Sequence, residues 1–136
     1  MDQQTLKWVF ACLRITVFLL LVGHSWLNLI DKPALVSEYK SIGFHQPETI
    51  AQCVGGIELL SALAILLFPS RPLLLAIFLW KMSSELLYPS YELFEWIERG
   101  GSYAAILAFW YCLKLRALSQ PEENLNKQIS ESPKQA

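Results

Sequence analysis

The chain has 136 residues, of which 54% are hydrophobic and only 17% charged, and this composition is too apolar for an ordinary small soluble domain. Its length and its mean hydropathy of +0.34 predict a single domain that is inserted in a lipid bilayer. The formal net charge of −1, with no basic patch interleaved with aromatic residues, argues against a nucleic-acid partner.

Four long apolar blocks follow one another along the chain. The first exceeds the roughly 20 residues that cross a ~30 Å hydrocarbon layer, and it lacks a small-residue cleavage site, so we interpret it as a retained span. Prolines and a short basic turn punctuate the later blocks. The expected spans are residues 8–30, 50–68, 72–88 and 94–115. The sequence therefore predicts an all-α, four-helix transmembrane bundle within residues 1–117.

Two polar segments lie outside these blocks. The longest loop, residues 31–49, contains the sequence "DKPALVSEYKSIGFHQPE" and is compatible with a re-entrant segment, a surface-lying segment or an exposed amphipathic loop. Residues 118–136 have the polar, proline-containing composition of a disordered tail. We expect this tail to be flexible and cytoplasmic.

The basic residues of the chain are distributed unevenly between the two sides of the expected bundle. One side carries Lys7, Arg71, Lys114, Arg116, Lys127 and Lys134, whereas the loops of the other side mix two lysines with several acidic residues. Because Lys and Arg concentrate on the cytoplasmic side, both termini are expected in the cytoplasm, as an even number of spans requires. We expect a multi-pass protein of the cell membrane, as in a bacterial inner membrane.

Five ionisable residues fall within the outer half of the expected spans. At 1.5 Å per residue, Glu58 and Lys81 lie about 12 Å deep, His24 about 9 Å, Arg99 about 7 Å and Glu85 about 6 Å. An unpaired charge at the bilayer centre costs roughly 2.5–3.5 kcal/mol, so these side chains are expected to face one another. Lys81 can pair with Glu85 one turn away or with Glu58 across the bundle. We predict one polar centre formed by all four helices.

Two interpretations of this polar centre stay open. In the first, the ion pairs and the small residues of "VGGIE" and "RGGSYAA" hold the helices together. In the second, Glu58 and Lys81 form the floor of an outward-facing pocket for a small ligand, a quinone head group or protons. The sequence names neither the ligand nor a cofactor.

Motifs for catalysis or metal binding are not recognisable in the sequence. The three cysteines, at positions 12, 53 and 112, are far apart and form no C-x-x-C pair. His24 and His45, even with Glu58, are a thin set of metal ligands. No nucleophile elbow or phosphate-binding loop is present. We therefore predict no catalytic site, no metal site and no independent enzyme activity.

Three segments resemble the DoxX-like family of small membrane proteins. "LRITVFLLLVGHSWLNL" resembles the first helix of that family, "GGIELLSALAILLFPSRP" its second helix, and "ERGGSYAAILAF" its fourth. By position, Arg14, Gly23 and Glu58 match the family pattern, whereas His24 stands where many members have a lysine. The resemblance implies a four-helix membrane subunit, tied in some members to quinone-linked sulfur oxidation or to a membrane-bound antioxidant assembly.

Two functions follow from these features. We expect an accessory subunit, or a small-ligand or quinone-binding component, of a membrane redox system, with other membrane proteins or further copies of itself as partners. The alternative is a minimal oligomeric transporter or proton-coupled permease that uses the charge cluster. Transport would require oligomers because four short helices enclose little space.

Overall fold

The computed structural model describes residues 3–86 and 93–131, and over these ranges the chain is all-α and has no strand. The described residues form five helices: α1 (Gln3–Leu29), α2 (Pro33–Ile42), α3 (Pro47–Leu67), α4 (Arg71–Leu86) and α5 (Leu93–Glu131). The prediction of an all-α chain is confirmed.

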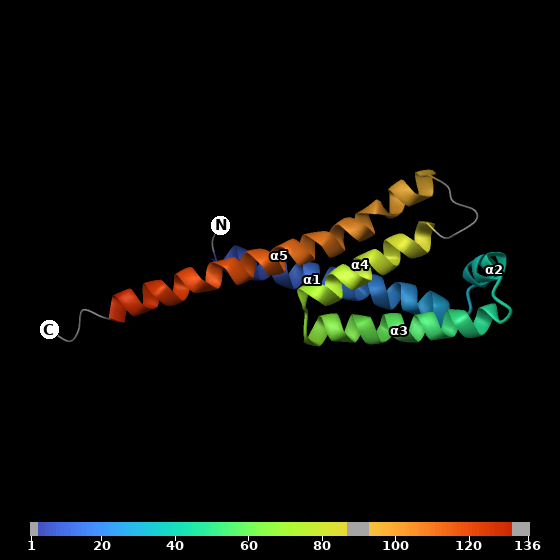
Figure 1. Ribbon diagram of the computed structural model, residues 1–136, viewed down its shortest axis with the longest axis horizontal. Coiled ribbons are helices and arrows are strands. Elements are labelled where there is room, and N and C mark those ends of the chain that lie inside the picture. Colours follow the sequence, from blue (N-terminus) through green and yellow to red (C-terminus); the bar gives the residue numbers. More distant parts are fainter. Residues whose placement is uncertain (1–2, 87–92, 132–136) are drawn as a thin grey trace.

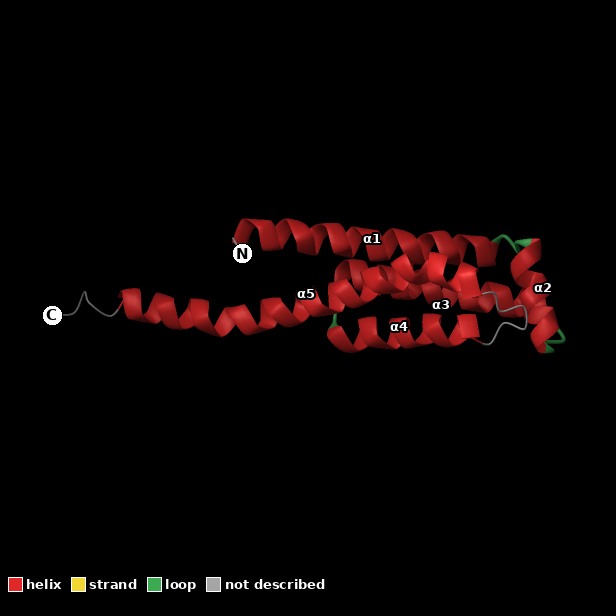
Figure 2. Ribbon diagram, turned by 90° about the horizontal axis from the view of Figure 1, so that it is seen from above, coloured by secondary structure: helices red, strands yellow, loops and turns green. Residues whose placement is uncertain are grey.

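Four of the helices run lengthwise beside one another, and α2 lies across one end of them (Figure 1). The view from above shows the same arrangement, with α2 standing across the end of the other helices (Figure 2). We call this end the α2 end. The opposite end, where the chain turns from α3 into α4, is called the turn end. Beyond the turn end, α5 runs beside the first turns of α1 and then continues alone toward the C-terminus (Figure 1).

Proline and glycine set the limits of the shorter helices. Pro33 and Pro47 stand in the first turns of α2 and α3, where a missing backbone N–H costs nothing. Gly43 ends α2 with a φ of 106°, a left-handed conformation that glycine adopts without strain. The segment 31–49, for which three interpretations were open, therefore contains a ten-residue helix.

The C-terminal part of α5 differs from the expected disordered tail. The backbone is helical as far as Glu131, whereas the composition predicted disorder from residue 118. Segment 117–131 contains several leucine, glutamate, glutamine and lysine residues, which favour helix, and a helix that is already formed needs only to be extended. Residues 132–136 lie outside the described part of the chain.

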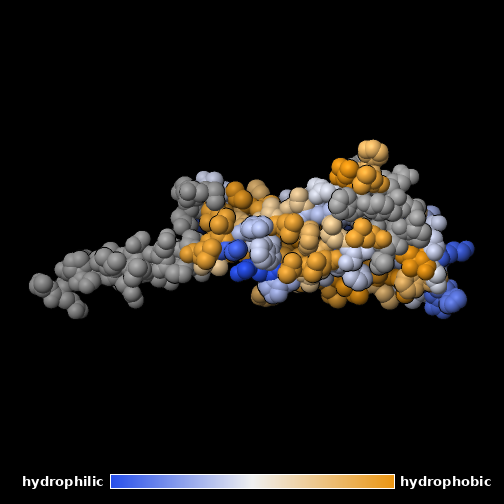
Figure 3. Space-filling view, turned by 45° about the horizontal axis from the view of Figure 1, so that its top comes forward, coloured by the Kyte–Doolittle hydropathy of each residue, from blue (hydrophilic) through white to orange (hydrophobic). Residues whose placement is uncertain are grey.

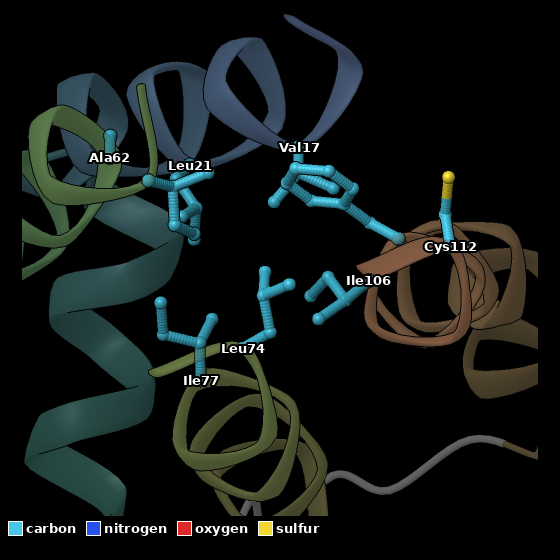
Figure 4. Close-up of a cluster of buried hydrophobic side chains, with 9 residues drawn as sticks. Val17, Leu21, Ala62, Leu74, Ile77, Ile106 and Cys112 are labelled. Atoms are coloured by element: carbon cyan, nitrogen blue, oxygen red, sulfur yellow. The ribbon is translucent and has the colours of Figure 1, made fainter. Parts of the chain in front are cut away.

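The apolar core lies toward the turn end and takes side chains from all four long helices (Figure 4). Phe10 of α1 packs edge-on against Phe109 of α5, with ring centroids 5.2 Å apart. The buried members of this core are Val17, Leu21, Ala62, Ile65, Leu74, Ile77, Ile106, Phe109 and Cys112. The half of the bundle nearer the turn end is therefore filled by hydrocarbon side chains.

Much of the remaining apolar surface faces outward. Figure 3 shows hydrophobic side chains along the visible face of the bundle, with hydrophilic ones at its right-hand end. By length and composition, two segments in the described ranges are suited to cross a membrane, Gln4–Leu29 and Pro47–Leu67. Only 17% and 28% of their most apolar windows are buried within the molecule, so most of each window lies at the surface of the bundle. That the four expected spans cross a membrane stays a prediction.

Candidate ligand-binding site

A buried ion pair joins α3 and α4. Lys81 donates from Nζ to Glu58 Oε1, and the two residues are only 6% and 3% exposed. The α3 and α4 backbones approach each other closely at few points, so long side chains are needed to join them. The structure thus brings together the two deepest charges of the predicted polar centre.

Two uncharged residues extend this ion pair into a network. Asn28 of α1 donates from Nδ2 to Glu58 Oε2 over 3.3 Å, and Tyr39 of α2 donates its hydroxyl to Asn28 Oδ1 over 3.2 Å. Both residues are buried. We call Tyr39, Asn28, Glu58 and Lys81 the buried network. It links α2, α1, α3 and α4, and each carboxylate oxygen of Glu58 accepts at least one hydrogen bond.

His24 lies at the edge of the buried network. Its Nε2 is 4.0 Å from Glu58 Oε1, and 29% of its side chain is exposed. Asn28 stands one turn further along α1 and also donates to the His24 carbonyl oxygen over 3.4 Å. His24 is thus placed to contact both the network and anything that enters from outside.

A close approach of α1 and α3 positions Asn28 next to Glu58. The Ser25 hydroxyl donates to the Gly55 carbonyl oxygen over 2.7 Å, and a Cβ on Gly55 would lie 3.0 Å from Asn28, Leu29 and Ser25 atoms. The neighbouring Gly56 faces open space instead. Of the two glycines in "VGGIE", Gly55 is therefore the one that sets the distance between the helices.

Two residues of the predicted polar centre have side chains that lie outside the described part of the structure. They are Glu85, which lies in α4, and Arg99, which lies in α5. Their membership of the polar centre stays a prediction. The described site contains three residues that were predicted, His24, Glu58 and Lys81. It also contains Ser25, Asn28 and Tyr39, which the search for ionisable residues did not identify.

Two pockets adjoin the buried network. The larger has a volume of about 420 Å³ and lies against Lys81, and the smaller has about 200 Å³ and lies against Glu58. His24 lines both pockets. The rest of the larger pocket is formed by Leu19, Leu20, Gly23, Leu27, Lys32, Ala34, Leu35, Glu38, Ser102, Tyr103 and Ile106. The rest of the smaller pocket is formed by Tyr39, Ile42, Phe44, Ile50, Val54, Trp80 and Ser84.

The chemistry of the site follows from these side chains. Lys81 and Tyr103 carry hydrogen-bond donors in the wall of the larger pocket, His24 carries a donor or an acceptor, and Glu38 carries a carboxylate. In the described part of the chain, no group of three His, Cys, Asp or Glu side chains is arranged to hold a metal ion. The site is therefore suited to binding a ligand that carries acceptor oxygens.

Comparison with protein-family models, curated proteins and solved structures finds no match to this chain.

Proposed function

We propose that the chain is a four-span membrane protein of the DoxX-like type, with both termini in the cytoplasm. In this proposal it binds a small ligand beside the Glu58–Lys81 pair and acts as an accessory subunit of a membrane redox system. One observation carries the proposal, namely a buried ion pair with a pocket on either side. A buried ion pair gains little stability over apolar packing, and ionisable groups within membranes often mark functional sites.

The arrangement along the bundle supports binding from one side. The buried network and the core occupy successive levels of the same helices, with Glu58 followed by Ala62 on α3, and Ile77 followed by Lys81 on α4. With the termini in the cytoplasm, the α2 end lies toward the outer surface. A ligand head group with acceptor oxygens, such as that of a quinone, would then reach Lys81 and His24 from the outer half of the membrane.

The same arrangement weakens the alternative of transport by a single chain. Leu74, Ile106 and Phe109 are fully buried and fill the bundle on the turn side of the buried network. A permeating ion or solute would meet hydrocarbon side chains there. Transport would therefore need a route between subunits of an oligomer, as the sequence already suggests for four short helices.

A double variant tests the proposal. Glu58→Gln with Lys81→Met removes both charges and keeps similar side-chain lengths, so no unpaired charge is buried. The amide oxygen of the new glutamine can still accept the hydrogen bond from Asn28. We expect this variant to be produced and folded like the native protein. We also expect the variant to lose the small molecule that co-purifies with the native protein from native membranes, which mass spectrometry of lipid extracts measures. A pull-down from the same membranes measures whether partner proteins are lost as well.

Two controls complete the test. Glu58→Gln alone should lower the yield of folded protein, because it breaks the buried Glu58–Lys81 ion pair and removes only one of its two charges. Gln52→Ala removes an exposed hydrogen bond of 2.9 Å to Asp31 outside both pockets, and it should leave ligand and partners unchanged. A double variant that retains the ligand, or a native protein recovered with neither ligand nor partner, would contradict the proposed function.

A further inference from the structure

The ion pair presents a different charge to each pocket. Lys81 lines the larger pocket and Glu58 does not, whereas Glu58 lines the smaller pocket and Lys81 does not. A ligand in the larger pocket therefore contacts Lys81, whose ammonium is paired with Glu58, and does not contact Glu58 itself. A ligand in the smaller pocket meets the carboxylate together with the aromatic rings of Tyr39, Phe44 and Trp80. An anionic group favours the larger pocket and is repelled from the smaller one.

Among the side chains that line the larger pocket, more carry a hydrogen-bond donor than carry an acidic group. Lys32 and Lys81 carry positive charge, Ser102 and Tyr103 carry hydroxyl groups, and Glu38 is the acidic residue among the lining side chains. Lysine ammonium groups donate and cannot accept hydrogen bonds. This polar part of the wall is therefore suited to an anionic oxygen acid.

Helix α2 adds to the positive potential of the larger pocket. Its first turns supply Ala34 and Leu35 to the wall, and no hydrogen bond from the Lys32 side chain caps the helix at this end. The N-terminus of a helix carries a partial positive charge and unpaired backbone N–H groups, both of which favour anions. Together with Lys81, which approaches from α4, it places positive charge on two sides of the pocket.

The remaining wall is hydrocarbon. Leu19, Leu20 and Leu27 of α1 and Ile106 of α5 line it, and Leu19 is 58% exposed on the outer surface of the bundle. An apolar chain can thus lie against the leucines of α1 that line the pocket. A volume of about 420 Å³ is within the range of pockets that hold small organic ligands, which is roughly 300–1,000 Å³.

From these features we infer that the larger pocket binds a single-chain amphiphile with a carboxylate head group, that is, a long-chain fatty acid anion. The head group lies among Lys32, Lys81 and the first turn of α2, and the acyl chain lies along the leucines of α1. This inference rests on the proposed function and names the class of ligand for the same site.

Competition between amphiphiles with different head groups, three of them with the same sixteen-carbon chain, tests the class of ligand. The full-length protein in detergent is loaded with radiolabelled hexadecanoate, which is then displaced by unlabelled hexadecanoate, hexadecan-1-ol, hexadecylamine or the neutral quinone decylubiquinone. We expect hexadecanoate to compete at least about tenfold better than the other three, because they lack a negative charge. A tenfold ratio corresponds to about 1.4 kcal/mol.

Two pairs of variants locate the binding site. Gly23→Leu places a side chain at a position that lines the pocket, where a Cβ atom would have no neighbouring atom within 4 Å, so it should block binding without disturbing the fold. Gly56→Leu, in open space outside both pockets, should bind normally. Lys32→Gln should weaken hexadecanoate binding about two- to fivefold, as expected for an exposed charge, and Lys40→Gln, outside the pocket, should not.

The outcomes separate this inference from the proposed function. The carboxylate inference is overturned if the alcohol or the amine competes as well as hexadecanoate, or if the quinone competes better. If Gly23→Leu then abolishes binding of the compound that competes, the pocket is still supported as a ligand site. If the Gly23→Leu variant binds hexadecanoate as the native protein does, the larger pocket is not the binding site. If none of the four compounds binds, the inference is overturned, and the proposed function then depends on the ligand recovered from native membranes.

Discussion

At the scale of single residues, the buried network is held together by mutual satisfaction of its polar groups. Asn28 donates to Glu58 and accepts from Tyr39, while Glu58 accepts from Asn28 and Lys81. Within an apolar surrounding, a polar group that loses its partner costs more than the bond itself contributed. Single substitutions in the network should therefore be more harmful than matched pairs of substitutions.

Tyr39→Phe tests the outermost bond of the network. The substitution keeps the ring and removes the hydroxyl that donates to Asn28 Oδ1 over 3.2 Å. We expect a loss of about 1–3 kcal/mol in the free energy of unfolding, because a buried acceptor loses a donor. Thermal unfolding in detergent measures this loss.

Ser41→Ala serves as the control, because the Ser41 hydroxyl donates to the Glu38 carbonyl oxygen at an exposed position on the same helix. Its unfolding temperature should match that of the native protein. If Tyr39→Phe unfolds at the same temperature as Ser41→Ala, the Tyr39–Asn28 bond contributes nothing to stability.

The sequence allowed part of this site to be predicted. Counting depth along each span placed Glu58 and Lys81 at one level, because a charge in an apolar block is conspicuous. Asn28 and Tyr39 were missed because uncharged polar residues stand out less, and Tyr39 lies on a helix that was not predicted. The position of Asn28 one turn after His24, on the same face of α1, is a signal that could have revealed it.

At the scale of helices, the crossing of α1 and α3 depends on one residue without a side chain. Gly55 brings its backbone against Ser25 and Asn28, and the Ser25 hydroxyl bonds to the Gly55 carbonyl oxygen. Small residues allow such close approach in membrane bundles, where packing and hydrogen bonds replace the hydrophobic effect between helices. The position of Asn28 beside Glu58 follows from this crossing.

Gly55→Ala should therefore destabilise the bundle. Its Cβ would lie 3.0 Å from the Ser25 carbonyl oxygen, a backbone atom that cannot move without shifting α1. We expect the free energy of unfolding to fall by about 1–3 kcal/mol, as for other overpacked sites. Gly56→Ala meets open space and should be neutral or slightly stabilising, since alanine favours helix. Equal unfolding temperatures for the two variants would show that α1 and α3 do not meet closely at Gly55.

The helices themselves were predictable to differing degrees. The expected span 50–68 corresponds closely to α3, because Pro47 marks its start and Pro69 follows its end. The helix α2 was not predicted, because ten residues of mixed polarity give a weak periodic signal. The extension of α5 was missed because composition describes a segment in isolation, whereas this segment continues an existing helix.

At the scale of the whole molecule, basic and aromatic side chains gather at the turn end of the bundle. At the turn end, the Arg71 guanidinium lies 5.1 Å from the centre of the Trp110 ring, and Lys114 lies 5.9 Å from the same centre. Arg116 lies 4.9 Å from the ring of Phe10. Basic and aromatic side chains are typical of the cytoplasmic interface of a membrane protein, which supports the proposed orientation.

Thiol labelling in intact cells tests this orientation. In a variant without native cysteines, Ser41→Cys on α2 should react with a membrane-impermeant maleimide, because the α2 end is expected outside. Gln4→Cys, near the start of α1, should react only after the cells are opened. Both positions are exposed in the structure, so burial does not limit either reaction. Labelling of Gln4→Cys in intact cells would contradict cytoplasmic termini.

The separation of Glu58 and Lys81 along the chain has a consequence for biosynthesis. Glu58 precedes Lys81 by 23 residues, so a ribosome adding roughly 5–20 residues per second makes the acid about one to five seconds before its partner. If α3 left the translocon alone, it would carry an uncompensated carboxylate into lipid. The short turn between Leu67 and Arg71 instead favours release of α3 and α4 as a hairpin, with the two charges already joined. In the proposed membrane protein, the ion pair beside the proposed ligand site would thus also determine which helices enter the membrane together.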